Sequence, residues 1–362
     1  MNTKSTPETP PARNRRPWRR RLGLLVVVLA IAALIIAPGF VIGPVAPEWS
    51  PEWLTEWSWD VRLWMGAKLR GLSSLTEGDL QDKRVYGWAP GERVSFVAED
   101  GLELVGTLYV PPRGEGPHPA LVVLHGSTPE GRGMALYRAM GTALAERGYV
   151  VLAYDQRGYG ESADPDSLTD PEDFDYAGDV SAAVDYLVQR PDVDAEAISV
   201  VGHSFGGDVA IAGGVEEDRI QRIVSIGPAR RLAERAEDEA GYFARRDRHY
   251  MHLWAGEIPP ETFMAYRTPL LLDSHVEYFQ QEDHKPIFLI DGSLESEDDL
   301  SWLETMYEEM TEPKAYYRVE GADHYMNMSG YSFLVAYLII YDEPAFETFI
   351  EELDAWLSEE TM

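Results

Sequence analysis

Cysteine is absent from this sequence of 362 residues, which excludes disulfide bonds, a thiolate nucleophile and cysteine-ligated metals. Lysine is scarce too, because only five of the 31 basic residues are lysine, and 62 residues are acidic. The formal net charge of −31 repels nucleic acid at long range. We therefore predict no nucleic-acid partner.

Two common ligand motifs are also missing. The chain contains no H-E-x-x-H pattern, which would hold a metal, and no G-x-x-x-x-G-K-[ST] loop, which would cradle a phosphate. With no cysteine available either, the sequence predicts neither a metal nor another cofactor.

The apolar run that is long enough to span a bilayer lies near the N terminus. Residues 1–21 carry seven basic side chains and one acidic one, and residues 22–45 are apolar apart from glycines and prolines. A spanning helix needs about 20 apolar residues, and its basic flank stays in the cytoplasm. We predict a basic cytoplasmic tail (1–21), a single-pass transmembrane anchor (22–45) and an extracytoplasmic main body. The alternative, a cleaved signal peptide, would also export that body.

Tryptophan is concentrated just after the predicted anchor, in residues 46–91. Trp53, Trp57, Val61 and Trp64 recur at helical spacing on one face. Tryptophan favours the boundary between membrane and water. This pattern predicts a juxtamembrane helix on the outer leaflet, with packing against the main domain as an equal alternative.

Residues 92–362 alternate strand and helix signals. Strands are predicted at 94–97, 102–110, 120–124, 149–154, 197–201, 220–226, 287–290 and 315–319, and helices at 136–147, 176–190, 205–214, 300–310 and 345–357. This order is typical of an α/β domain with a mostly parallel central sheet and helices on both faces. The alternation stops at about 229–285, a stretch too long for a plain connection, which predicts a helical lid inserted after the sixth strand.

A short glycine-flanked motif carries the clearest chemical signal. Gly202-His203-Ser204-Phe205-Gly206 stands between a predicted buried strand and a predicted helix. A sharp turn there lifts the serine hydroxyl out of the sheet, and the helix N terminus directs N–H groups at a reacting oxygen. The sequence therefore predicts Ser204 as a nucleophile; the alternative is a serine that only caps the helix.

Four further blocks match a known superfamily in the same order. They are residues 101 and 106–112, residues 124–127 (L-H-G-S), residues 154–162 (Y-D-Q-R-G-Y-G-E-S) and residues 321–324 (G-A-D-H). With the serine motif they make residues 92–358 resemble the α/β-hydrolase superfamily, in particular dienelactone-hydrolase-like and prolyl-oligopeptidase-like enzymes. The resemblance implies the α/β-hydrolase fold. It also implies an oxyanion hole, which we assign to the backbone N–H groups of Ser127 and Phe205.

One of the eight histidines is placed to act as a general base. His324 follows a late strand, in a turn marked by Gly321 and Asp323, so it can reach Ser204 across the carboxyl edge of the sheet. His125 and His203 lie in the motif loops, where we expect them to make loop hydrogen bonds.

The acid of the triad must lie between the serine and the histidine in the chain. In the resembling family it stands three residues after a glycine that follows the strand, usually as aspartate. Here that position is Glu295, and Asp291, Asp298 and Asp299 remain rivals. Asp208, one turn into the helix after Ser204, departs from the small or apolar residue usual there, without an explanation from the sequence.

These features predict acyl transfer to water through an acyl-enzyme, with carboxylic esters as the first substrate class. A peptidase or amidase of the same fold and a non-catalytic binding protein are the alternatives. The apolar run at 331–341 is too short to span a bilayer. It is either a core helix or the lining of an acyl pocket, and in the second case the substrate is lipid-like.

Overall fold

The computed structural model describes residues 91–114, 116–128, 131–229, 258–326 and 343–359. The predicted tail, membrane anchor, nearly all of the Trp-rich segment and the apolar run at 331–341 lie outside these residues. Within the described residues, no helix combines the length and the apolar character needed to cross a membrane.

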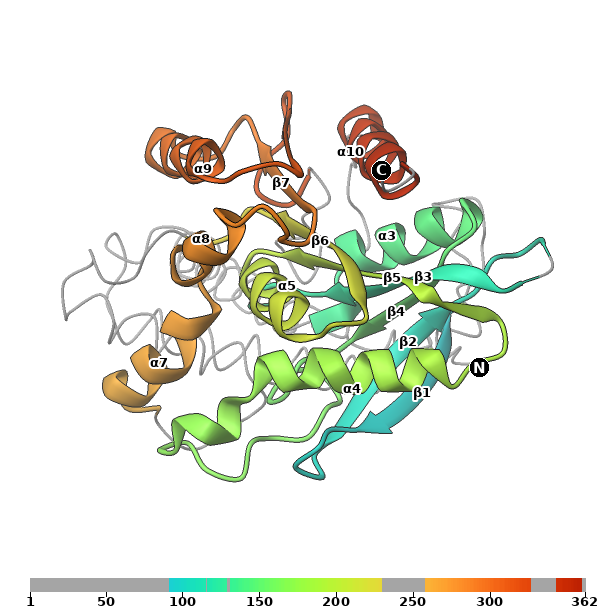
Figure 1. Cartoon of the computed structure of the whole chain (residues 1–362). Helices are drawn as coiled ribbons and strands as arrows, with labels where there is room; N and C mark the ends of the chain where they lie inside the picture. Colours follow the sequence, from blue (N-terminus) through green and yellow to red (C-terminus); the bar gives the residue numbers. More distant parts are fainter. Residues whose placement is uncertain (1–90, 115, 129–130, 230–257, 327–342, 360–362) are drawn as a thin grey trace, which may run out of the picture. The chain divides into compact units, whose positions relative to one another are not determined.

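An eight-stranded sheet forms the centre of the described domain (Figure 1), in the order β1-β2-β4-β3-β5-β6-β7-β8. Its strands are β1 (Glu92–Val97), β2 (Glu103–Tyr109), β3 (His118–Leu124), β4 (Val150–Tyr154), β5 (Val193–His203), β6 (Ile220–Ile226), β7 (Ile287–Gly292) and β8 (Lys314–Val319). β2 pairs antiparallel with both β1 and β4, and every later pairing is parallel. The predicted α/β class with a mostly parallel central sheet is confirmed.

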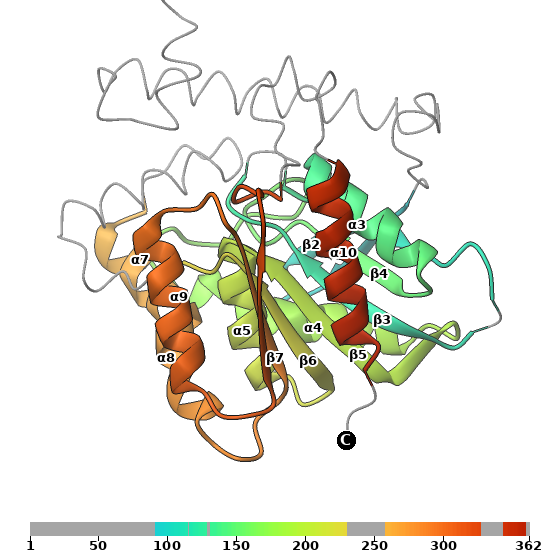
Figure 2. The same cartoon turned by 90° about the horizontal axis from the view of Figure 1, so that it is seen from above.

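Helices cover both faces of the sheet, as Figures 1 and 2 show from two directions. They are α3 (Ala135–Glu146), α4 (Tyr176–Val188), α5 (Phe205–Glu216), α7 (Pro260–Arg267), α8 (Leu272–Phe279), α9 (Glu297–Glu309) and α10 (Glu343–Leu357). Side chains alternate across a strand, so Val122 and Leu124 of β3 join one core cluster with α4, α5 and α9. Leu121 and Val123 join the opposite cluster, with α3 and α10.

The C-terminal part of the predicted lid packs into the core of the domain. Phe263 of α7 and Leu272 and Phe279 of α8 are buried in the same core cluster as the helix α5, and α8 also contacts α9. An amphipathic helix gains stability by burying its apolar face, and α8 does so beside the sheet. The helical lid predicted at about 229–285 stays a prediction, because residues 230–257 lie outside the described part of the chain.

A buried ion pair anchors the loop that follows β4. Arg157 is almost fully buried, and its Nε and Nη2 donate to Asp179 of α4 at 2.8 and 2.6 Å. A third nitrogen, Nη1, donates to Asp100 in the β1–β2 turn and to the carbonyl of Asp173. The arginine of the 154–162 motif thus joins three segments of the fold and has a structural role.

We predict that Asp179→Asn lowers the free energy of unfolding by about 3–5 kcal/mol, because Arg157 would keep its charge in a buried site without its main partner. Asp185→Asn is the matched control, since Asp185 pairs with Arg219 at the exposed surface, where such a pair contributes at most about 1 kcal/mol. Denaturant unfolding of the full chain, followed by circular dichroism, measures both. Equal losses in the two variants would contradict the structural role of Arg157.

Candidate active site

Ser204 occupies a strained turn between β5 and α5. Its backbone has φ 56° and ψ −121°, a conformation that side-chain-bearing residues rarely adopt and that costs on the order of 1–3 kcal/mol. The flanking glycines make the turn possible. A Cβ on Gly202 would overlap the Gly206 carbonyl, and a Cβ on Gly206 would overlap the carbonyl of Leu124. The Ser204 N–H donates to the Ile226 carbonyl at 2.7 Å, which ties the turn to β6.

The loop after β3 lies directly against the serine. A Cβ on Gly126 would stand 2.9 Å from the Cβ of Ser204, so only glycine fits there without a shift. The Gly126 N–H donates to the Tyr137 hydroxyl at 2.7 Å. Within the described chain, the N–H groups of Ser127 and Phe205 donate to no other group. These two groups, one on each side of the turn, are the pair expected to form the oxyanion hole.

His324 and Glu295 meet at the same edge of the sheet. Glu295 follows β7 and His324 follows β8, and Glu295 Oε2 lies 3.1 Å from His324 Nδ1. Burial by itself would raise the pKa of Glu295, but the hydrogen bond and charge of His324 hold this pKa below its ordinary value. The Leu294 N–H donates to the Ala322 carbonyl at 3.0 Å, so the two loops are also joined through their backbones.

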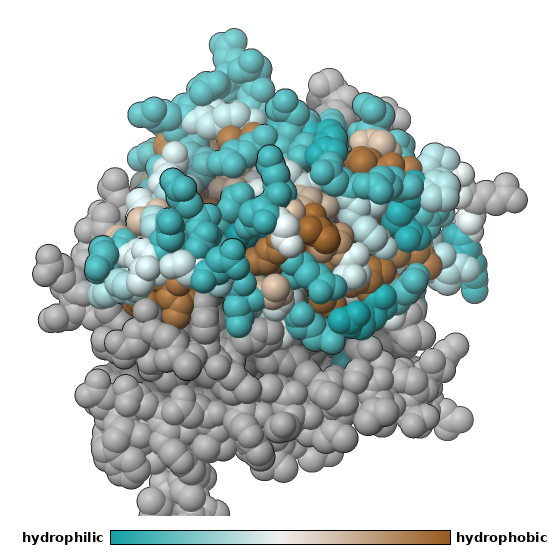
Figure 3. Space-filling model, turned by 90° about the horizontal axis from the view of Figure 1, so that it is seen from below, coloured by the Kyte–Doolittle hydropathy of each residue, from teal (hydrophilic) through white to brown (hydrophobic). Residues whose placement is uncertain are grey.

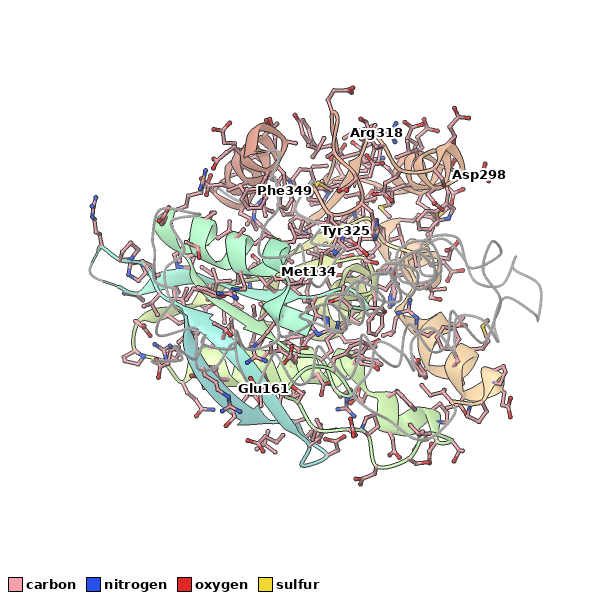
Figure 4. All side chains as sticks on the ribbon, turned by 180° about the vertical axis from the view of Figure 1, so that it is seen from behind. Met134, Glu161, Asp298, Arg318, Tyr325 and Phe349 are labelled. Carbon is pink, nitrogen blue, oxygen red and sulfur yellow. The ribbon has the colours of Figure 1, made fainter. Side chains whose placement is uncertain are left out.

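Each rival of Glu295 is placed elsewhere. Asp291 accepts two hydrogen bonds from Arg318 at 2.9 Å and one from the Tyr316 hydroxyl at 2.7 Å. Asp299 is held by Ser296, which caps the N terminus of α9. Asp298 is exposed on α9, and Figure 4 places it at the edge of the molecule, well apart from Tyr325, the neighbour of His324.

The serine turn and the histidine loop are adjacent. His203, which precedes Ser204, shares a hydrogen bond of 2.6 Å between its Nε2 and the His324 carbonyl, and the two imidazole centres are 4.8 Å apart. A Cβ on Gly227, which follows β6, would stand 3.0 Å from the His324 ring. The Ser204 hydroxyl and His324 do not hydrogen-bond here, and such bonds often tighten only when substrate binds.

His125 is a structural residue of the oxyanion loop. Its Nε2 accepts the Gln156 N–H at 3.0 Å, so the proton of the neutral ring lies on Nδ1, which donates to the Gly126 carbonyl at 2.7 Å. The Gln156 side chain donates back to the His125 carbonyl at 2.6 Å. This agrees with the predicted role in loop hydrogen bonding and links the 124–127 loop to the 154–162 loop.

The structure explains Asp208. It is fully buried, accepts the Ala229 N–H at 3.0 Å and forms an ion pair with Arg267 at 3.1 Å. The Arg267 guanidinium in turn lies over the Phe205 ring, 4.2 Å from its centre. This pair connects the segment after β6 to the nucleophile helix. Arg267 was missed from sequence because it lies 59 residues away, in a region with weak structural signals.

Tyr137 was missed as well. Its position in α3 carries only the pattern of a buried helix, yet its hydroxyl contacts both Gly126 and His203.

Across the residues that the structure describes, no group of three or more His, Asp or Glu side chains is arranged to hold a metal ion.

Known proteins are similar in sequence to the part of the chain around Ser204. The family described as "Serine aminopeptidase, S33" matches residues 115–269, a range that ends before Glu295 and His324. The chain is 37% identical over 136 residues to the thiohydrolase aneE of Aspergillus aculeatus, covering 37% of this chain and 41% of that protein. It is 34% identical over 139 residues to the esterase EstD of Thermotoga maritima, covering 36% and 32% of the two chains.

The similarity to solved structures extends further. The alpha/beta hydrolase GrgF from Penicillium sp. sh18 superposes with a TM-score of 0.53 at 20% identity, over 74% of this chain and 98% of that one. The matching stretch spans less than half the length of the two curated relatives, whereas the fold agrees over nearly the whole of GrgF. With the strand order and the serine turn described above, these similarities show that the chain has the α/β-hydrolase fold.

Proposed function

We propose that this protein is a serine hydrolase that cleaves carboxylic ester bonds, with Ser204 as nucleophile, His324 as general base and Glu295 as the acid of the triad. The observation that carries the proposal is the contact of 3.1 Å between Glu295 and His324, at the sheet edge where Ser204 sits in its strained turn.

The geometry suggests how each group acts. His324 Nδ1–H donates to Glu295, so Nε2 is free to take the proton of the Ser204 hydroxyl as the hydroxyl attacks the carbonyl carbon. Glu295 stabilises the imidazolium that forms. The Ser127 and Phe205 N–H groups stabilise the oxyanion, and each such donor contributes about 3–4 kcal/mol in comparable enzymes. The imidazolium protonates the leaving alcohol, and water then releases the acyl group by the reverse proton path.

Esters are favoured over peptides by the relatives named above. One curated relative is named an esterase and another a thiohydrolase, and neither of these two is named a peptidase. The peptidase or amidase alternative stays open because the matching family is described as an aminopeptidase. A non-catalytic binding protein is less consistent with the site, because such a protein has no need of the strain at Ser204.

A membrane location is the second part of the proposal. The basic residues 1–21 and the apolar residues 22–45 support a single-pass anchor with the hydrolase domain outside the cytoplasm.

The face of the molecule shown in Figure 3 carries small apolar patches among polar side chains. Among the described residues, one of the exposed large apolar side chains is Leu294, beside Glu295, and it would suit an ester with a long acyl chain.

We predict that Ser204→Ala lowers turnover of an activated ester such as p-nitrophenyl butyrate by about 10⁶-fold, because the nucleophile is lost while the oxyanion hole remains. A fluorophosphonate probe should label the wild-type protein at Ser204 and leave the variant unlabelled. Turnover of Ser204→Ala within about tenfold of wild type would refute the mechanism, and an unreactive Ser204 would favour the binding protein.

We predict that Glu295→Gln lowers turnover by about 10⁴-fold, because the imidazole loses the partner that fixes its tautomer. Asp298→Asn and Asp299→Asn are the matched controls. Each removes a nearby carboxylate without touching His324, so their turnover should stay close to that of wild type. A collapse in either control, with Glu295→Gln still active, would reassign the acid.

If the substrate is lipid-like, p-nitrophenyl esters of longer acyl chain should be hydrolysed faster by the full chain, and liposomes should increase this preference. The measurement is a chain-length series from acetate to laurate with and without liposomes. A preference for acetate that liposomes leave unchanged would instead indicate a hydrolase of small esters that is merely anchored.

A further inference from the structure

A buried chain of hydrogen bonds runs from the oxyanion loop to the loop of the general base. The Gly126 N–H donates to the Tyr137 hydroxyl at 2.7 Å, and this hydroxyl lies 2.8 Å from His203 Nδ1. His203 Nε2 lies 2.6 Å from the His324 carbonyl oxygen. The chain thus joins segments that follow β3 and β8 through one side chain of α3 and one at the end of β5.

The chemistry of the partners gives the proton positions. A carbonyl oxygen can only accept, so His203 Nε2 must carry the proton that it donates to His324. In the neutral ring Nδ1 is then an acceptor, and the Tyr137 O–H donates to it. The Tyr137 oxygen at the same time accepts the Gly126 N–H. Every donor along the chain points from the oxyanion loop towards the base loop.

The surroundings keep the His203 ring neutral. The ring is fully buried, and its burial, together with the neighbouring His324, holds the pKa of His203 well below its ordinary value. The hydrogen bond to the His324 carbonyl opposes this effect and does not overcome it. A protonated ring would turn Nδ1 into a donor and break the sequence of donors at Tyr137.

We propose that Tyr137 and His203 are positioning residues that hold the oxyanion donor at Ser127 and the base His324 at a fixed distance on either side of Ser204. For its catalytic consequence this inference rests on the proposed hydrolase function. Both ends of the chain are main-chain groups, so it acts on the positions of the two loops. It also occupies the Gly126 N–H, which leaves the N–H of Ser127 as the donor of this loop that can face the substrate.

The expected loss of rate follows from how sensitive catalysis is to the position of the catalytic groups. A shift of about 1 Å in a catalytic group costs on the order of 10²-fold in rate. Tyr137→Phe removes the hydroxyl and leaves the Gly126 N–H and His203 Nδ1 without their partner. We expect kcat to fall about 10- to 100-fold while KM stays within about twofold, as for other outer residues that orient reacting groups. The affinity for a trifluoromethyl ketone, which mimics the tetrahedral intermediate, should fall by the same factor as kcat.

The matched control is Tyr278→Phe. The Tyr278 hydroxyl also accepts a backbone N–H, that of Lys285 at 3.0 Å, but it lies on α8, which contributes no residue to the site. The same chemical change there should lower the melting temperature without changing kcat. His203→Asn can keep an acceptor for Tyr137 but is too short to donate to His324, so we expect a loss of kcat like that of Tyr137→Phe. Because the chain acts as a unit, the double variant should lose little more than either single variant.

A second readout is independent of turnover. In the full-length protein labelled with ¹⁵N-histidine, the resonance that disappears in His203→Asn should show a neutral ring protonated at Nε2, and its Nδ1 shift should change in Tyr137→Phe. The inference is overturned if Tyr137→Phe keeps kcat within twofold of Tyr278→Phe, if its loss lies wholly in KM, or if His203 is protonated at Nδ1. A wild-type protein without turnover would instead refute the proposed hydrolase function. The tautomer of His203 would then still test whether the hydrogen-bond chain exists, without its catalytic consequence.

Discussion

The rest of the site depends on the close approach of backbone segments around Ser204. The residue adopts a left-handed conformation because β5 must turn sharply into α5, and glycine is needed wherever another segment comes near. Gly202 and Gly206 allow the turn itself, and Gly126 and Gly227 bring the oxyanion loop and the histidine loop alongside it. Strain of this kind persists only where the surroundings over-determine the conformation. Here the Ser204 N–H is fixed to β6, and the residue before it is fixed to the His324 loop.

Hydrogen bonds from buried side chains to main-chain groups help to hold the loops around Ser204 in one conformation. His125 and Gln156 bind each other's backbones, and Tyr137 and His203 connect two loops that are almost 200 residues apart in the sequence. Such groups are costly to bury unless every donor and acceptor has a partner. A loop held in this way has few alternative positions. The strongly acidic chain follows the same rule in its core, where Asp179 and Asp208 are each paired with an arginine.

The segment after β6 is joined to the helix that follows Ser204. Its C-terminal helices belong to the structural layer beside α5, and Arg267 at the end of α7 contacts both Asp208 and the Phe205 ring. A change in this segment would therefore directly affect Phe205, whose N–H is a predicted oxyanion donor.

Local sequence patterns determined the order of strands and helices, the serine turn and the candidate residues Glu295 and His324, because hydrophobic periodicity and glycine spacing report on short-range structure. The strand at 220–226 was predicted with its observed bounds. The strand predicted at 197–201 was placed correctly but is longer in the structure, where β5 runs from Val193 to His203. Tertiary structure decided between Glu295 and its three rivals, since Asp291 lies in β7, Asp298 and Asp299 follow it closely, and the packing shows which carboxylate meets His324. It also decided the partner of Asp208, the place of α8 and the role of Tyr137. Those contacts join residues far apart in the chain, and no periodicity or spacing in the sequence records them.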